Sequence, residues 1–244
     1  MAPLPEPSAW PAAHRRRLRE VYRSAGWPCQ DGIEVELLAA GLLERRRDDA
    51  GRETLRVTDA GVQLLAATLR RHRAAFDAHE SLVLRMVREM QRAGRLAWRG
   101  LKLRAPPPDG DGPRIWPVVA PDVFSIRHTT VEDYVEPIVH EVKVHRADLL
   151  ADLRHEAKRA AYLALSGQCW YVLKAGIGGA DDVPPECGVL IAHDTHLEVE
   201  RAAPRRAMRL PLGTWMALAR ASAEPPDENE AQARLGDPGG EAEA

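Results

Sequence analysis

Two short apolar segments carry charged residues in a pattern that strongly restricts the fold. The first is Pro121–Phe124, which contains Asp122, and the second is Ile138–Val144, which contains Glu141 and Lys143. Strand side chains alternate between faces, so Glu141 and Lys143 point the same way while the valines beside Lys143 point to the core. If the two segments pair, Asp122 can lie beside Glu141 and Lys143. Two carboxylate ligands and one ammonium group then meet, which suits a divalent metal and a scissile phosphate.

Lysine is rare in this chain, which makes the lysine at position 143 more significant. Among 34 basic residues, the lysines are Lys102, Lys143, Lys158 and Lys174, and all others are arginine. A lysine ammonium is a compact point charge whose pKa shifts on burial, a property that arginine does not share. The formal net charge of −2 is uneven, because residues 223–244 hold seven acids and one base. The remainder is mildly basic, which permits nucleic-acid binding without requiring it.

The chain is predicted to form two domains and a tail. Residues 1–78 form a small helical module, residues 79–222 a larger domain, and residues 223–244 an acidic, disordered tail. The order helix, helix, hairpin, helix across Leu18–Leu69 is similar to winged helix-turn-helix domains, with one core helix fewer. The resemblance makes the hairpin a wing in which Arg45, Arg46 and Arg47 contact phosphates. A partner-binding or dimerising winged domain is equally compatible with the sequence.

Periodicity in the larger domain predicts helices separated by strands. The expected helices are 74–94 and 147–166, and the expected strands are 96–103, 116–126, 138–144, 169–173, 188–192 and 197–199. This order, together with Pro-Asp and Glu-x-Lys, resembles the PD-(D/E)XK nuclease superfamily, particularly its small bacterial DNA-repair members. The resemblance implies an α/β (α+β) fold with a restriction-endonuclease-like core, in which helices flank a mixed sheet.

The resemblance also implies roles for individual residues. Asp122 and Glu141 would bind Mg²⁺ or Mn²⁺, and the carbonyl of Val142 would add a ligand. Lys143 would stabilise the negative charge that develops during phosphodiester hydrolysis. Many members add an acid from the first helix. Glu80 is the candidate, because a helical wheel places it at the edge of a face marked by Phe76, Val83, Val87 and Met90.

The helix after the lysine shows two stripes. Leu153 and the alanines at positions 157, 160, 161 and 164 are expected to pack on the sheet. Arg154, Lys158 and Tyr162 form the second stripe, which would border the site and contact DNA phosphates. The alternative is a solvated helix face.

Other features limit the function. The three cysteines have no zinc spacing, and a zinc site at His193 and His196 is not expected, because no cysteine is near and a turn places both side chains unpredictably. No apolar run is long enough to span a membrane, which predicts a soluble, cytoplasmic protein without a membrane partner. Residues 208–218 would serve a homodimer interface or complete the core.

The leading hypothesis is a magnesium-dependent deoxyribonuclease acting in DNA repair or in defence against foreign DNA. Its main alternative is a non-catalytic DNA- or partner-binding protein that keeps the nuclease fold. A winged-helix regulator with a ligand-sensing domain is a third hypothesis.

Overall fold

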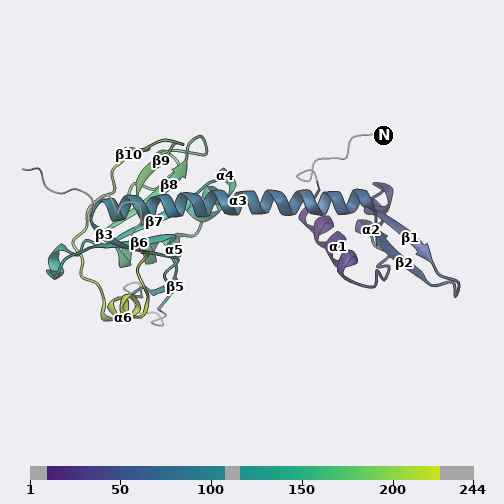
Figure 1. The fold of residues 1–244 in the computed structure, drawn as a ribbon, viewed down its shortest axis with the longest axis horizontal. Coiled ribbons are helices and arrows are strands. Elements are labelled where there is room, and N and C mark those ends of the chain that lie inside the picture. Colours follow the sequence, from purple (N-terminus) through teal and green to yellow (C-terminus); the bar gives the residue numbers. More distant parts are fainter. Residues whose placement is uncertain (1–9, 108–115, 226–244) are drawn as a thin grey trace, which may run out of the picture. The chain divides into compact units, whose positions relative to one another are not determined.

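The computed structural model describes residues 10–107 and 116–225 (Figure 1). The chain divides into two compact units, Met1–Asp77 and Ala78–Ala244. The boundary falls inside one long helix, α3 (Asp59–Arg92). Only Ala223, Glu224 and Pro225 of the expected acidic tail are described, and the rest of it lies outside the described residues.

The first unit has the expected order of helix, helix, hairpin and helix. Its elements are α1 (Ala12–Arg23), α2 (Gly32–Ala39), β1 (Leu43–Arg47), β2 (Glu53–Val57) and the start of α3. The Asp31 side chain caps α2 by accepting a hydrogen bond from the Glu34 amide at 2.9 Å. Leu18, Leu37 and Leu55 pack in one core that joins both helices to the hairpin.

A close backbone approach fixes Gly26 in this unit. Its φ is +74°, in the left-handed region, and its carbonyl accepts a hydrogen bond from the Leu55 amide at 2.6 Å. A Cβ at this position would lie 2.0 Å from the Leu55 carbonyl oxygen. Only glycine satisfies both the conformation and the contact.

One helix replaces two that the sequence predicted. The expected helices on either side of residues 70–73 are continuous as α3, because this arginine-rich stretch has good helix formers and neither proline nor glycine. Gly94, at φ +73°, follows the helix end. The expectation that Phe76 marks the buried face was wrong, since Phe76 is 63% exposed. Val83 and Val87 are buried as expected, and Leu82 and Met86 are buried beside them.

The second unit contains a mixed six-stranded sheet, which confirms the predicted α/β class with a mixed sheet flanked by helices. The strand order is β10-β9-β8-β7-β6-β3. Pairing is antiparallel between β3, β6 and β7, parallel from β7 to β9, and antiparallel at β10. The strands are β3 (Arg95–Arg99), β6 (Val123–Arg127), β7 (Ile138–Lys143), β8 (Gln168–Lys174), β9 (Gly188–Ala192) and β10 (Leu197–Arg201).

Two expected strands are shorter than the sequence predicted. The run 96–103 divides into β3 and β4 (Leu103–Arg104), and the run 116–126 divides into β5 (Val118–Val119) and β6. Gly100 has φ +55° and breaks the first run. β4 and β5 then pair as a small separate sheet. A short 3-10 helix, η2 (Glu132–Tyr134), lies between β6 and β7.

Each face of the large sheet has its own core. On one face, Val123, Val142 and Val172 pack against Leu82 and Met86 of α3. On the other, Val139 and Tyr171 pack with α5 (Glu156–Leu165). Leu210 and Leu218 also belong to the second core, and Leu218 lies on α6 (Leu212–Arg220). The segment 208–218 therefore contributes to the core.

The helix expected at 147–166 is broken into α4 (Arg146–Leu153) and α5. The assigned stripes were right only in part, since Leu153 and Ala161 pack on the core as expected. The alanines at positions 157, 160 and 164 are exposed, whereas Tyr162 and Leu165 are fully buried and Lys158 is half-buried beside them. The break rotates α5 relative to a continuous helix, and the Lys158–Tyr162 stripe consequently faces the sheet.

Candidate active site

The two halves of the charged pattern meet in the sheet. Asp122 directly precedes β6, and Val123 pairs with His140 of β7, so Asp122 comes next to Glu141 in the antiparallel register. The Asp122 carboxylate accepts a hydrogen bond from the Val142 amide, with 2.7 Å between Oδ2 and N. Because this amide lies between Glu141 and Lys143, the bond fixes Asp122 beside both residues.

Glu141 is a buried carboxylate with several donors around it. Its Oε1 lies 2.5 Å from Lys143 Nζ and 2.7 Å from Lys158 Nζ, and its side chain is 4% exposed. Its Oε2 accepts a hydrogen bond from the Tyr162 hydroxyl at 2.9 Å. A buried carboxylate requires such partners, since an uncompensated charge in the interior costs several kcal/mol.

A second acid, Asp152, completes this cluster. Its Oδ1 lies 2.6 Å from Lys158 Nζ and 3.5 Å from Lys143 Nζ, and its Oδ2 accepts from the Tyr171 hydroxyl at 2.9 Å. Sequence reasoning missed Asp152 because its segment reads as one unbroken helix without proline or glycine. The turn between α4 and α5 brings Asp152 to Lys158.

Electrostatics keeps Asp152 and Lys158 charged and the two tyrosines protonated. Burial raises the pKa of Asp152, but the Lys158 hydrogen bond and the charges of both lysines outweigh burial and lower it. Burial lowers the pKa of Lys158, but Glu141 and Asp152 reverse this effect and raise it. Burial together with the nearby carboxylates raises the pKa of Tyr162 and Tyr171 far above the usual phenol value. Both hydroxyls therefore remain protonated donors.

α3 contributes His79 to Asp122, a contact that sequence reasoning missed. His79 Nε2 lies 3.4 Å from Asp122 Oδ2, and His79 Nδ1 lies 3.4 Å from Glu80 Oε1. The hydrogen bond with Asp122 raises the pKa of His79 despite burial, which lowers it. The predicted site residue Glu80 thus reaches Asp122 through His79, and its other oxygen lies 3.6 Å from Arg99.

The residues expected to contact DNA lie in different environments. Lys158 is an internal partner of two acids, and Tyr162 is fully buried, so its ring is not available to a surface ligand. Arg154 is exposed at the end of α4, one residue before the N-cap of α5. His140, beside Glu141 in sequence, faces the opposite core, where burial lowers its pKa to about 3 and keeps it neutral.

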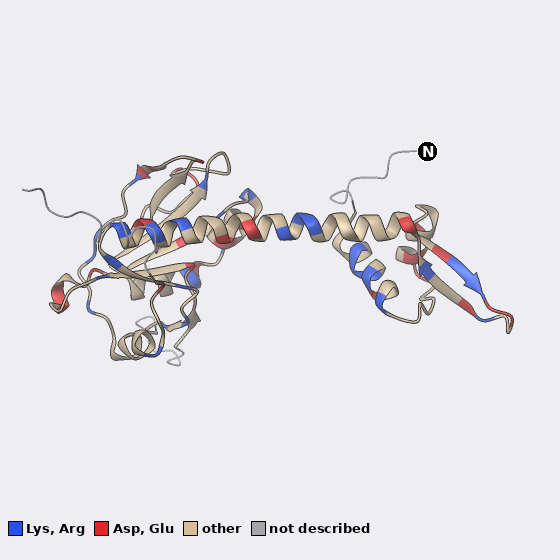
Figure 2. Cartoon of the chain, viewed as in Figure 1, with Lys and Arg blue, Asp and Glu red and all other residues tan. Residues whose placement is uncertain are grey.

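The arginines expected in a wing form most of β1, which is largely blue in Figure 2. All three are exposed, and each is paired with an acid of its own unit. Arg45, Arg46 and Arg47 lie 3.2, 2.9 and 2.7 Å from Glu34, Glu44 and Glu53, respectively. The pairs of Arg46 and Arg47 are exposed and therefore weak, whereas Arg45 is held by Glu34, whose side chain is fully buried.

The residues of this cluster that could hold a metal ion are Asp122, Glu141 and Val142. Two carboxylates and the Val142 carbonyl are oxygen donors, which Mg²⁺ and Mn²⁺ prefer. Because these are only three donors, a cation bound there would complete its shell with water or substrate. Elsewhere in the described residues, a set of three side chains has ligand atoms within 4.8 Å of one another, namely His193, His196 and Glu198.

Comparison with known proteins gives a distant structural likeness. No protein-family model matches this chain, and neither does any curated protein. SPO1766, a protein of unknown function from Silicibacter pomeroyi, is similar at 23% identity, covering 61% of this chain and 82% of its own, with a TM-score of 0.36. A likeness at that TM-score supports no conclusion about function. Among the described helices, none is both long and apolar enough for a membrane span.

Proposed function

We propose that this protein is a metal-dependent nuclease of the PD-(D/E)XK type that hydrolyses phosphodiester bonds in DNA. The observation that carries the proposal is the hydrogen bond from the Val142 amide to Asp122. This bond joins the Pro-Asp half of the motif to the Glu-x-Lys half, although Asp122 and Val142 are 20 residues apart in sequence. A surface Glu–Lys pair on a strand needs no such contact, whereas here the backbone between Glu141 and Lys143 holds a second acid.

Asp122, Glu141 and the Val142 carbonyl would hold Mg²⁺ or Mn²⁺. When bound, the ion would supply positive charge to the scissile phosphate and lower the pKa of a water molecule. Asp122 is the accessible member of the set, with 22% of its side chain exposed. The Tyr162 hydroxyl orients Glu141 by holding Oε2, which leaves Oε1 towards the lysines.

Lys143 would act on the reacting phosphate. Its ammonium contacts the Glu141 carboxylate, and its side chain is 12% exposed, so its charge is only partly screened by water. A fixed, poorly solvated cation stabilises negative charge that develops in the transition state. Lys158 contacts both Glu141 and Asp152 and is a positioning residue, since it compensates their charges when Lys143 moves to substrate.

The test is cleavage of supercoiled and single-stranded DNA by the full chain with Mg²⁺, Mn²⁺ or EDTA. Asp122→Ala and Lys143→Ala should each lower the rate by about 100-fold or more, as removal of a transition-state contact does. Lys102→Ala, which removes an exposed lysine, should cut at the wild-type rate. Cleavage that survives in both site variants, or that needs no metal, would refute the proposal.

A second candidate function is DNA or partner binding without catalysis. One observation favours it: Glu141 already has two lysines and a tyrosine as partners and is 4% exposed. A metal ion would have to displace an ammonium group from Oε1. This function predicts DNA binding that persists in EDTA and in Lys143→Ala, with no cleavage in either metal.

A further inference from the structure

The hairpin between β9 and β10 places three potential metal ligands on one face. Ala192 pairs with Leu197, and the His193 amide donates to the His196 carbonyl at 3.0 Å, so Asp194 and Thr195 form a tight two-residue turn. Directly opposed positions carry their side chains on the same face of a hairpin. Glu198 follows His196 by two residues and therefore lies on that face as well.

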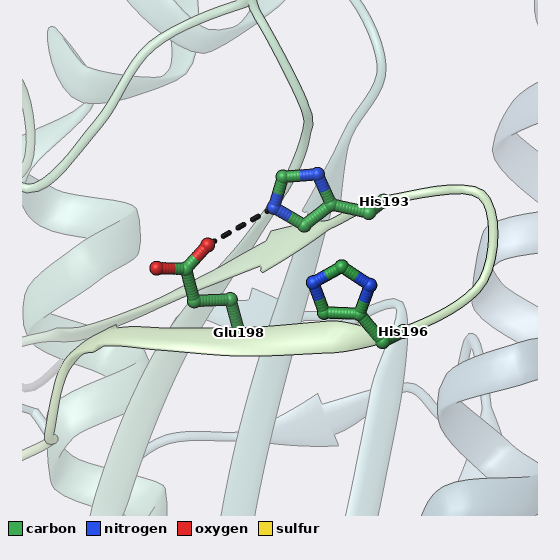
Figure 3. A group of neighbouring side chains, drawn as sticks. All are labelled: His193, His196 and Glu198. Carbon is green, nitrogen blue, oxygen red and sulfur yellow. Dashed lines mark hydrogen bonds and ion pairs between the residues drawn. The ribbon is translucent and has the colours of Figure 1, made fainter.

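The side chains are close together in the present structure (Figure 3). His193 Nε2 lies 3.0 Å from Glu198 Oε2. The two imidazole rings stack with centroids 4.4 Å apart and planes 9° from parallel. One nitrogen of each ring and one Glu198 oxygen all lie within 4.8 Å of one another. Three donors of this chemistry thus converge without any change in the backbone.

We propose that His193, His196 and Glu198 form a second metal site, which binds Zn²⁺. Two imidazoles and one carboxylate are borderline ligands that suit Zn²⁺, whereas Mg²⁺ prefers oxygen-only shells. A tetrahedral ion with bonds of about 2.0–2.1 Å holds its ligands about 3.3 Å apart. Side-chain rotation closes the remaining gap, because the Glu198 side chain is 58% exposed and is free to adjust.

The surroundings favour an open, accessible site. Three protein ligands leave the fourth position to water or to a ligand. The hairpin is anchored from α3, where the Arg85 guanidinium donates to the His193 carbonyl.

This site is distinct from the one at Asp122. It consists of other side chains at another place on the sheet, and its imidazoles select a different class of metal. Sequence reasoning did not expect it, because a turn can point two histidines in unrelated directions. The two-residue turn removes that freedom, and Glu198 supplies the third ligand that the absent cysteines would otherwise have to provide.

The experiment is Zn²⁺ titration of tag-free full-length protein by calorimetry, with Co²⁺ absorption in the visible range as a report of tetrahedral coordination. Wild type should bind one Zn²⁺ here. His196→Ala and Glu198→Gln should each weaken binding by at least about tenfold and remove the tetrahedral Co²⁺ spectrum. Glu198→Gln preserves side-chain size and separates ligand loss from misfolding.

Three controls make the result decisive. His128→Ala removes an exposed histidine outside the cluster, and Cys29→Ser removes the exposed thiol, so both should bind as wild type does. Asp122→Ala should also keep this Zn²⁺ affinity, which separates the site from the proposed nuclease centre. Zn²⁺ affinity equal to wild type in both His196→Ala and Glu198→Gln would overturn the proposal, as would a wild type that binds no Zn²⁺.

Discussion

Replacement of Tyr162 by phenylalanine tests the central feature of the candidate site, the buried carboxylate of Glu141. The substitution removes one hydroxyl that donates to Glu141 Oε2 at 2.9 Å and lies 3.2 Å from the Ala120 carbonyl oxygen. The aromatic ring stays in the fully buried position. A hydrogen bond to a charged group contributes about 1.5–3 kcal/mol, and here its loss leaves a buried carboxylate oxygen with one donor fewer. We expect a destabilisation of about 2 kcal/mol.

Native-state hydrogen exchange of the full chain measures this effect within the second unit. A loss of about 2 kcal/mol lowers the protection of β7 and β8 amides roughly 30-fold. Tyr134→Phe changes a side chain that is 63% exposed and should alter protection by less than about twofold. In Glu141→Gln, the Tyr162→Phe effect should shrink by about 1 kcal/mol or more, because the two groups interact directly. A Tyr162→Phe effect equal to that of Tyr134→Phe would refute the reasoning.

Two further predictions concern α3 and the first unit. Since Asp122 raises the pKa of folded His79, the pair stabilises the protein fully below about pH 6.5 and loses this effect as pH rises through the raised pKa. The difference in unfolding free energy between wild type and His79→Gln should therefore shrink from acidic to alkaline pH. A difference that does not change with pH would contradict the pairing. Gly26→Ala should destabilise the β1–β2 hairpin by more than about 2 kcal/mol in hydrogen exchange, because its Cβ meets the Leu55 carbonyl. Gly51→Ala, at a similar φ of +78° but with nothing within 4 Å, should cost only about 1 kcal/mol, and equal costs would show that the contact is unimportant.

Local pattern predicted those parts of the fold that depend on neighbours in sequence. Alternation placed Val142 on one face of its strand and Glu141 with Lys143 on the other, and the structure has Val142 in the core with Leu82. The mixed sheet flanked by helices was expected from the resemblance to the PD-(D/E)XK superfamily, which rests on the order of the predicted helices and strands together with the motif residues.

Errors of prediction arose where the decisive contact is distant or the local signal is absent. No proline or glycine marks the break between α4 and α5, so Lys158 and Tyr162 were expected to contact DNA at the border of the site and not to be internal partners of its acids. The join of two expected helices into α3 has the same origin, since helix formers fill the region between them. Helix propensity therefore continues α3 through residues 70–73, whereas tertiary packing sets the break between α4 and α5.

The sequence by itself determined the strand faces, the spacing of Asp122 and Glu141, and the scarcity of lysine that draws attention to Lys143. Only the tertiary structure decided that Asp152 and His79 join these residues, and that His193 and His196 stack above the hairpin. The physical reason is that alternation along a strand is a property of local backbone geometry. The identity of a side chain's partners depends on register, helix rotation and burial, and these are set by the packing of the whole unit.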